Sequence, residues 1–212
     1  MPHYNLRHLK QPPKQLAGTA IQDDEALFLY SIVVGMRLKR VLEVGGFKGY
    51  SATNFLAATG PSGVVYTCDV NEVDKVSPQH ILLKKSAADL VPEDVGGLPL
   101  DLVFFDCHVY EAQMKAFETL SEAGIITDRT VLALHDTNTY PSDTIASRLP
   151  PGSYAIQDGT FVHQAVERRM VNDLSDKGYH AFLLHTTPDK HSEDFPYRKG
   201  VAVMTKFKHL EL

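Results

Sequence analysis

The sequence predicts an α/β fold with a doubly wound, mostly parallel sheet and helices on both of its faces. Two observations support this prediction: strand-like and helical patterns alternate along the chain, and the strand-like runs are apolar throughout, as in strands buried on both faces. With 212 residues and 43% hydrophobic content, the chain can form one domain with a substantial core. We therefore expect a single domain over residues 1–212.

The order of the elements predicts a seven-stranded sheet. The last two strand-like runs have no helical pattern between them, which predicts an antiparallel C-terminal strand. The expected strands cover residues 40–45, 63–69, 80–86, 100–106, 130–136, 179–187 and 199–207. The expected helices cover residues 23–36, 50–60, 110–124 and 163–178.

Two segments fall outside the alternation of strands and helices. Residues 1–35 read as an N-terminal arm followed by an added helix, and residues 137–162 are rich in Pro, Gly, Ser and Thr. In open α/β sheets, ligands bind beyond the carboxyl ends of the strands. Because residues 137–162 follow a strand end, we expect them to be an inserted substrate loop that acts as a lid.

Composition argues against several classes of partner. The formal net charge is −5, and the basic residues form no long run, so nucleic acid is not an expected partner. No apolar run of about 18 residues and no signal-peptide pattern occur, so we expect no membrane partner and a cytoplasmic protein. Cys68 and Cys107 end apolar runs and read as buried free thiols. The sequence leaves the oligomeric state open, including a homo-oligomer.

The stretch VLEVGGFKGYS, residues 41–51, is a glycine-rich loop directly after a strand. The spacing of Gly45, Gly46 and Gly49 does not match the G-x-G-x-x-G pattern of dinucleotide-binding folds, and no P-loop Gly-Lys-Ser/Thr is present. The spacing does match acidic-x-Gly-x-x-x-Gly, with Glu43 as the acidic residue. Glycine at these positions lets the backbone pass close to a ligand.

This loop resembles that of class I S-adenosylmethionine (SAM)-dependent methyltransferases, in particular the catechol and caffeoyl-coenzyme A O-methyltransferases. The resemblance continues through the order of elements from about residue 25 to residue 207. It implies a Rossmann-like sheet and SAM as the cofactor, bound at Glu43, Gly45, Gly46 and Gly49. Related O-methyltransferases that act on antibiotic sugars have similar acidic strand ends.

Three further residues are expected to contact SAM. Asp69 ends a strand twenty residues after Gly49, where a carboxylate can accept hydrogen bonds from both ribose hydroxyls. The resemblance also implies that Ser86 and Ala87, just past the next strand, contact the adenine.

The resemblance also implies a site for a divalent metal ion, Mg²⁺ or Mn²⁺. In these enzymes one Asp at the end of the fourth strand and an Asp-Asn pair at the end of the fifth bind the ion; the matching residues here are Asp106, His135 and Asp136. Such an ion would hold the acceptor hydroxyl and lower its pKa. Without a metal, Asp106 would contact the methionine end of SAM, and His135 and Asp136 would form a hydrogen-bonded pair.

The resemblance does not supply the general base, because the family's lysine three positions after the first Asp is Val109 here. His108 is the first candidate and His163 the second. The expected activity is O-methylation of a hydroxyl on a small molecule. The alternatives are a metal-independent methyltransferase with a histidine base, and a non-catalytic SAM-binding subunit. N-methylation is disfavoured because residues 106–109 lack the Asn/Asp-Pro-Pro-Tyr/Phe motif.

Overall fold

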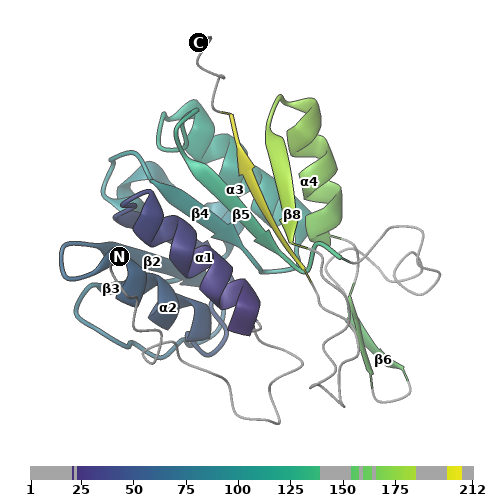
Figure 1. Cartoon of the computed structure of the whole chain (residues 1–212), viewed down its shortest axis with the longest axis horizontal. Helices are drawn as coiled ribbons and strands as arrows, with labels where there is room; N and C mark the ends of the chain where they lie inside the picture. Colours follow the sequence, from purple (N-terminus) through teal and green to yellow (C-terminus); the bar gives the residue numbers. More distant parts are fainter. Residues whose placement is uncertain are drawn as a thin grey trace.

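A computed structural model describes residues 21, 23–138, 154–157, 160–163, 166–184 and 200–206. Its centre is a seven-stranded sheet in the order β3-β2-β1-β4-β5-β9-β8 (Figure 1). The strands of this sheet are β1 (Arg40–Val44), β2 (Val64–Asp69), β3 (His80–Lys84), β4 (Leu102–Phe105), β5 (Val131–His135), β8 (His180–Leu184) and β9 (Val201–Thr205). The helices are α1 (Asp23–Gly35), α2 (Tyr50–Thr59), α3 (Tyr110–Glu122) and α4 (Val166–Asp176), with short 3₁₀ turns at η3 (Ala87–Asp89) and η4 (Pro92–Val95).

The strand directions confirm the predicted sheet. Strands β1 to β5 pair in parallel. Strand β9 is antiparallel to both of its neighbours, β5 and β8. The seven-stranded, mostly parallel sheet with an antiparallel C-terminal strand is therefore as expected.

The helices cover both faces of the sheet (Figure 1), as predicted. On one face, Val41 and Phe104 pack with Phe55 of α2 and with apolar residues of α1. On the other face, their neighbours Leu42 and Phe105 pack with α3 and α4. This alternation follows from the period of two along a strand. Among the described helices, none is both long enough and apolar enough to cross a membrane.

The segment predicted as an inserted loop contains a small hairpin. Strands β6 (Tyr154–Gln157) and β7 (Thr160–His163) pair antiparallel in a separate two-stranded sheet. Consequently the last long helix begins at Val166, later than the predicted start at His163. Aromatic and β-branched residues favour these strands over an irregular loop. Residues 1–20 and 139–153 lie outside the described residues, so the arm and the lid stay predictions.

The carboxyl edge of the parallel strands positions the functional groups. The amide of Gly45 donates to the carbonyl of Cys68 at 2.9 Å, and the amide of Asp106 donates to the carbonyl of Val44 at 2.8 Å. These bonds extend the pairing of β1 with β2 and β4 past the strand ends. The loops that follow these strands are thereby held side by side.

Candidate functional site

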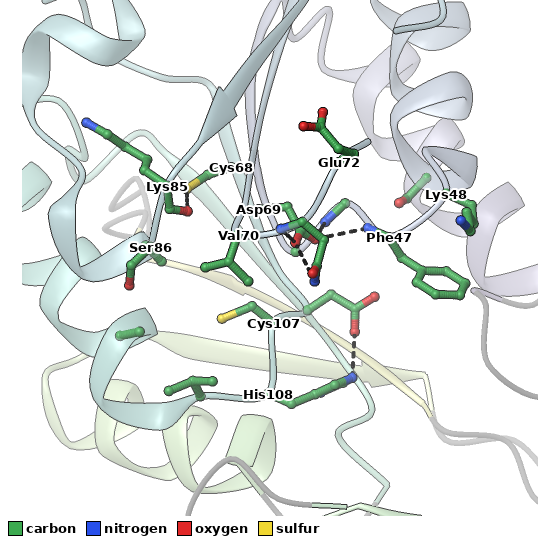
Figure 2. A pocket seen from close by; sticks show the side chains of 18 of the residues that line it. Phe47, Lys48, Cys68, Asp69, Val70, Glu72, Lys85, Ser86, Cys107 and His108 are labelled. Atoms are coloured by element: carbon green, nitrogen blue, oxygen red, sulfur yellow. Dashed lines mark hydrogen bonds and ion pairs between the residues drawn. The ribbon is translucent and has the colours of Figure 1, made fainter. Parts of the chain in front are cut away.

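A cavity of about 660 Å³ opens at this edge (Figure 2). Its volume lies within the range of roughly 300–1,000 Å³ that is usual for small-molecule sites. The structure brings together on its wall most of the predicted cofactor-binding residues, namely Gly45, Gly46, Asp69, Ser86, Ala87 and Asp106. The predicted base His108 lies on the same wall. Glu43 and Gly49 are not among the lining residues.

The glycine loop is shaped by close backbone approaches. Gly45 has a φ of 98°, and a Cβ there would lie 2.5 Å from the carbonyl oxygen of Asp106. Gly49 has a φ of 72° and caps the N-terminus of α2. A side chain at Gly45 would therefore separate the loop from the end of β4, and only glycine permits both features.

Glu43 lies beneath the loop, fully buried. The Thr67 hydroxyl donates to its Oε2 at 2.6 Å, and the Ser51 hydroxyl donates to its Oε1. Burial raises the pKa of Glu43 to about 8, although the hydrogen bonds from Ser51 and Thr67 lower it. Because Ser51 itself lines the cavity, Glu43 supports the cavity wall from behind.

Asp69 binds the glycine loop directly. Its Oδ2 accepts from the amides of Gly46 at 2.8 Å and Phe47 at 3.1 Å, and its Oδ1 accepts from the amide of Asn71 at 2.8 Å (Figure 2). The strand-end carboxylate thus holds the loop against β2. Nearby, Ser86 caps the turn η3 by accepting from the amide of Ala88 at 3.2 Å.

Asp106, His108 and Asp136 form an acidic cluster in which one possible ligand atom of each residue lies within 4.8 Å of the others. His108 Nε2 is 3.7 Å from Asp106 Oδ1 and 3.6 Å from Asp136 Oδ2. The backbone is left-handed at both His108 and Asp136, with φ of 57° and 53°. Such conformations are uncommon outside glycine and gather at functional sites.

The third predicted metal ligand, His135, lies beside this cluster between carboxylates. It is only 2% exposed, with Nδ1 at 3.1 Å from Asp106 Oδ1 and Nε2 at 3.0 Å from Glu25 Oε2. Burial lowers the pKa of His135, but Asp106, Asp136 and Glu25 outweigh it and raise that pKa well above its usual value. Because both ring nitrogens face carboxylates, His135 holds the cluster together, and His108 offers the nitrogen that faces the two aspartates.

His108 is held from behind by Glu167 of α4. Its Nδ1 lies 3.0 Å from Glu167 Oε1, and its backbone amide donates to the same oxygen at 3.1 Å. Burial lowers the pKa of His108, but the carboxylates of Glu167, Asp106 and Asp136 outweigh it and raise that pKa to about 9. The second candidate base, His163, ends β7, and its side chain lies outside the described part of the chain.

Sequence reasoning missed Glu25 and Glu167, although a signal for both was present. Each is fully buried and lies on the apolar stripe of its helix. Glu25 precedes Leu29 by four residues, and Glu167 precedes Met170 by three. Helical periodicity therefore places both carboxylates on buried faces, where an acidic residue requires a partner.

Comparison with known proteins agrees with this fold. Residues 3–89 match the model of the O-methyltransferase family. That span includes the glycine loop, Asp69, Ser86 and Ala87. No curated protein sequence matches the chain.

Solved structures with the same fold span almost the whole chain. The cofactor-bound protein Rv0187 from MTB has a TM-score of 0.62 at 16% identity, covering 96% of this chain and 94% of that chain. The O-methyltransferase TomG from Streptomyces achromogenes, involved in tomaymycin synthesis and solved with SAM, has a TM-score of 0.58 at 16% identity, covering 93% and 91%. The Bacillus cereus O-methyltransferase in complex with SAH has a TM-score of 0.60 at 15% identity, covering 90% and 84%.

The fold is that of the class I methyltransferases, as the sequence predicted. Together with the family match over residues 3–89, this confirms the predicted resemblance to the O-methyltransferases.

Proposed function

We propose that the protein transfers a methyl group from SAM to a hydroxyl of a small molecule, with assistance from a divalent cation. The observation that carries this proposal is the single cavity that joins the glycine loop and Asp69 to the acidic end of β4, at Asp106 and His108. A cofactor bound at the loop would thus lie next to groups able to act on an acceptor. The family match supports the same class of reaction.

In the proposed complex, Gly45 and Gly46 let the cofactor approach the backbone, and Asp69 accepts hydrogen bonds from the ribose. Asp69 accepts four hydrogen bonds, and the longest, at 3.3 Å, comes from the side-chain amide of Asn71. A ribose hydroxyl can replace that contact without loosening the bonds to the loop amides. Ser86 and Ala87 border the same cavity and are proposed to contact the adenine.

The reaction requires an acceptor oxygen in line with the methyl carbon and the sulfur. The oxygen forms a bond to the methyl carbon while the carbon–sulfur bond breaks, leaving a neutral thioether, and the hydroxyl proton passes from the acceptor to water. Alignment of these atoms supplies a large part of the rate enhancement. The remaining requirement is an environment that makes the hydroxyl acidic.

We propose that Asp106, His108 and Asp136 hold the divalent cation. The two carboxylates are suitable ligands for Mg²⁺ or Mn²⁺, and the imidazole adds a nitrogen ligand of the kind that transition-metal ions bind. The charge of the region favours a bound cation, because the carboxylates outnumber the imidazoles of His108 and His135. The four carboxylates are those of Glu25, Asp106, Asp136 and Glu167. When bound, the cation would hold the acceptor oxygen and lower the pKa of its hydroxyl.

The protonation of His108 favours this role over that of a metal-free base. With its pKa raised to about 9, His108 carries a proton at neutral pH and is unable to accept another. A bound cation would take the place of that proton at Nε2. His163 remains a predicted alternative base.

The test is turnover in the presence of a chelator, with SAM binding measured in parallel by calorimetry. We expect chelation to abolish methyl transfer from labelled SAM across a panel of hydroxyl acceptors, and Mg²⁺ or Mn²⁺ to restore it. SAM affinity should remain nearly unchanged, because the proposed cofactor contacts are at the loop and Asp69. Full turnover by protein shown to be metal-free would rule out the cation, and SAM binding without transfer to any acceptor would support a non-catalytic binding subunit.

A further inference from the structure

Glu167 is a buried carboxylate with an unusual set of partners. It is the second residue of α4 and is fully buried. Its Oε1 faces three donors: the backbone amide of His108 at 3.1 Å, Nδ1 of His108 at 3.0 Å, and Nε2 of Gln113 at 3.2 Å. Its Oε2 has no hydrogen-bond partner among the described residues. All of the hydrogen bonds observed for Glu167 are therefore made with His108 or with Gln113.

This arrangement is costly for the fold alone. Burying a carboxylate in an apolar interior is unfavourable unless it is fully paired, and an unpaired buried oxygen adds to that cost. The residues beside Glu167 on α4 pack in the core, among them Val166 and Met170. A core position on this helix would be satisfied by an apolar residue, so the carboxylate points to a role at the site.

The contacts of Glu167 determine what His108 presents to the cavity. A carboxylate facing Nδ1 keeps the proton on that nitrogen, which leaves Nε2 as the atom that faces Asp106 and Asp136. The bond to the backbone amide holds His108 in its left-handed conformation, with a φ of 57°. One carboxylate oxygen thus constrains both the ring and the backbone.

We propose that Glu167 is a positioning residue: by holding His108 in one tautomer and one orientation, it sets the affinity of the site for its divalent cation. Histidines that bind metals commonly donate their other ring N–H to a carboxylate, and loss of such a partner typically costs about 10- to 100-fold in metal affinity. This inference rests on the proposed function, because it requires that His108 bind the cation.

The test is Mn²⁺ binding to the full chain, measured by electron paramagnetic resonance after removal of metal. Glu167→Gln removes the charge while keeping the size, and we expect it to weaken Mn²⁺ binding by about 10- to 100-fold. In the His108→Ala background the same substitution should change the affinity by less than about 2-fold, because a residue that acts through His108 has nothing to position there. Asp176→Asn, at the exposed end of α4, makes the same charge change and should bind Mn²⁺ as the wild type does.

Each outcome decides a different point. If the wild type binds Mn²⁺ and Glu167→Gln binds it equally well, the positioning role is wrong while the proposed function stands. An equal loss with and without His108 would also overturn it, since the effect would then not pass through the imidazole. Wild-type protein that binds no Mn²⁺ would overturn this inference together with the cation in the proposed function. Should Glu167→Gln fail to fold, Glu167→Asp keeps the charge but shortens the reach, and unweakened Mn²⁺ binding by that variant would contradict the proposal.

Discussion

His108 and His135 both lie beside Asp106, but their environments give them different chemistry. Both nitrogens of His135 face carboxylates in a nearly closed interior, so the ring is best accommodated as a cation that bridges Glu25 and Asp106. His108 has Glu167 beside its Nδ1, its Nε2 faces Asp106 and Asp136, and the residue lines the cavity. The same residue type thus serves once as a structural charge and once as a group available to a ligand.

Replacing Asp69 tests the proposed contact with the cofactor ribose. We expect Asp69→Ala to weaken SAM binding by about 1.5–3 kcal/mol, or roughly 10- to 150-fold in Kd, because a charge-assisted hydrogen bond is lost and the loop amides lose their acceptor. Isothermal titration calorimetry measures the change. The exposed Asp128 provides a matched control, since Asp128→Ala should leave the affinity unaltered. Equal affinities for both variants would exclude Asp69 from the cofactor site.

Replacing Glu43 tests the consequence of burying a carboxyl group beneath the loop. In the folded protein the pKa of Glu43 is raised from 4.5 to about 8, mainly by burial. At a pH between 4.5 and about 8, Glu43 keeps its proton in the folded state but loses it in the unfolded chain. The contribution of Glu43 to stability is therefore fully present below pH 4.5 and is lost as the pH rises through about 8.

Glu43→Gln removes this titration while preserving the shape of the neutral acid. Between about pH 5 and about pH 8, the free energy of unfolding of the wild type should fall relative to that of the variant by on the order of 3 kcal/mol. Urea denaturation in chelator at the two pH values measures this difference. The exposed Glu118 gives the control, because Glu118→Gln should follow the wild type at both values. A wild-type-to-variant difference independent of pH would show that Glu43 is ionised in the folded protein.

The sequence predicted which carboxylates meet at the site, but not the buried acids that give the two histidines their different roles. Asp106 and Asp136 follow strands that pair in parallel, so their meeting at one edge could be expected. The roles of the two histidines depend on Glu25 and Glu167, which lie 110 and 59 residues away along the chain. Contacts of this kind arise from the packing of helices on the sheet, which a local pattern does not specify.

Among the elements, the glycine loop restricts most strongly which residue can occupy a position. Gly45→Ala would combine a left-handed backbone with a Cβ placed 2.5 Å from the carbonyl oxygen of Asp106. Gly97 is also left-handed, with a φ of 64°, but a Cβ there would meet nothing within 4 Å. Comparison of the two variants separates the cost of the backbone conformation from the cost of the collision.

We expect Gly97→Ala to lower the free energy of unfolding by about 1–2 kcal/mol, the cost of a left-handed L-residue. Gly45→Ala should exceed this loss by about 2 kcal/mol or more, because neither backbone segment can move away without breaking strand pairing. Only Gly45→Ala should also weaken SAM binding. Urea denaturation and calorimetry give the two measurements, and equal losses of stability would mean that the loop and the end of β4 separate easily.

The elements themselves were largely predictable, because apolar runs and helical spacing extend over many residues. The start of the last helix was not: residues 163–165 continue the helical pattern, but His163 pairs with Tyr154 in the hairpin. Cross-strand pairing between residues that are nine positions apart outweighs a weak helical preference over three residues. The predicted boundary was wrong for that reason.

At the scale of the whole molecule, the acidic cluster of Asp106, His108 and Asp136 is linked to helices from both faces of the sheet. Glu25 comes from α1 on one face and Glu167 from α4 on the other, while Asp106 and Asp136 follow central strands (Figure 1). A cation bound by Asp106, His108 and Asp136 would bind the folded state alone, because these strand ends are brought together only by folding. Cation binding should therefore stabilise the entire fold.

The size of this effect follows from the linkage between binding and folding. With Mn²⁺ at about 100 times its Kd, the free energy of unfolding should rise by about 2.7 kcal/mol, which for a chain of this length corresponds to a Tm increase of roughly 5–11 °C. Thermal denaturation with and without Mn²⁺ measures it. Asp106→Asn should show a much smaller increase, and an unchanged wild-type Tm would contradict binding of the ion at this site.

The bond between the Gly200 amide and Glu25 Oε1, at 2.9 Å, joins residues 175 positions apart. A ribosome that adds roughly 5–20 residues per second needs about 9–35 s to travel between them. Through that interval the nascent N-terminal helix has its acidic group exposed to water, without the amide that later receives it. His135 likewise emerges 110 residues after Glu25. The contacts of Glu25 are thus completed only after residue 200 has been added, and a nascent chain released before that residue would lack the amide that secures α1.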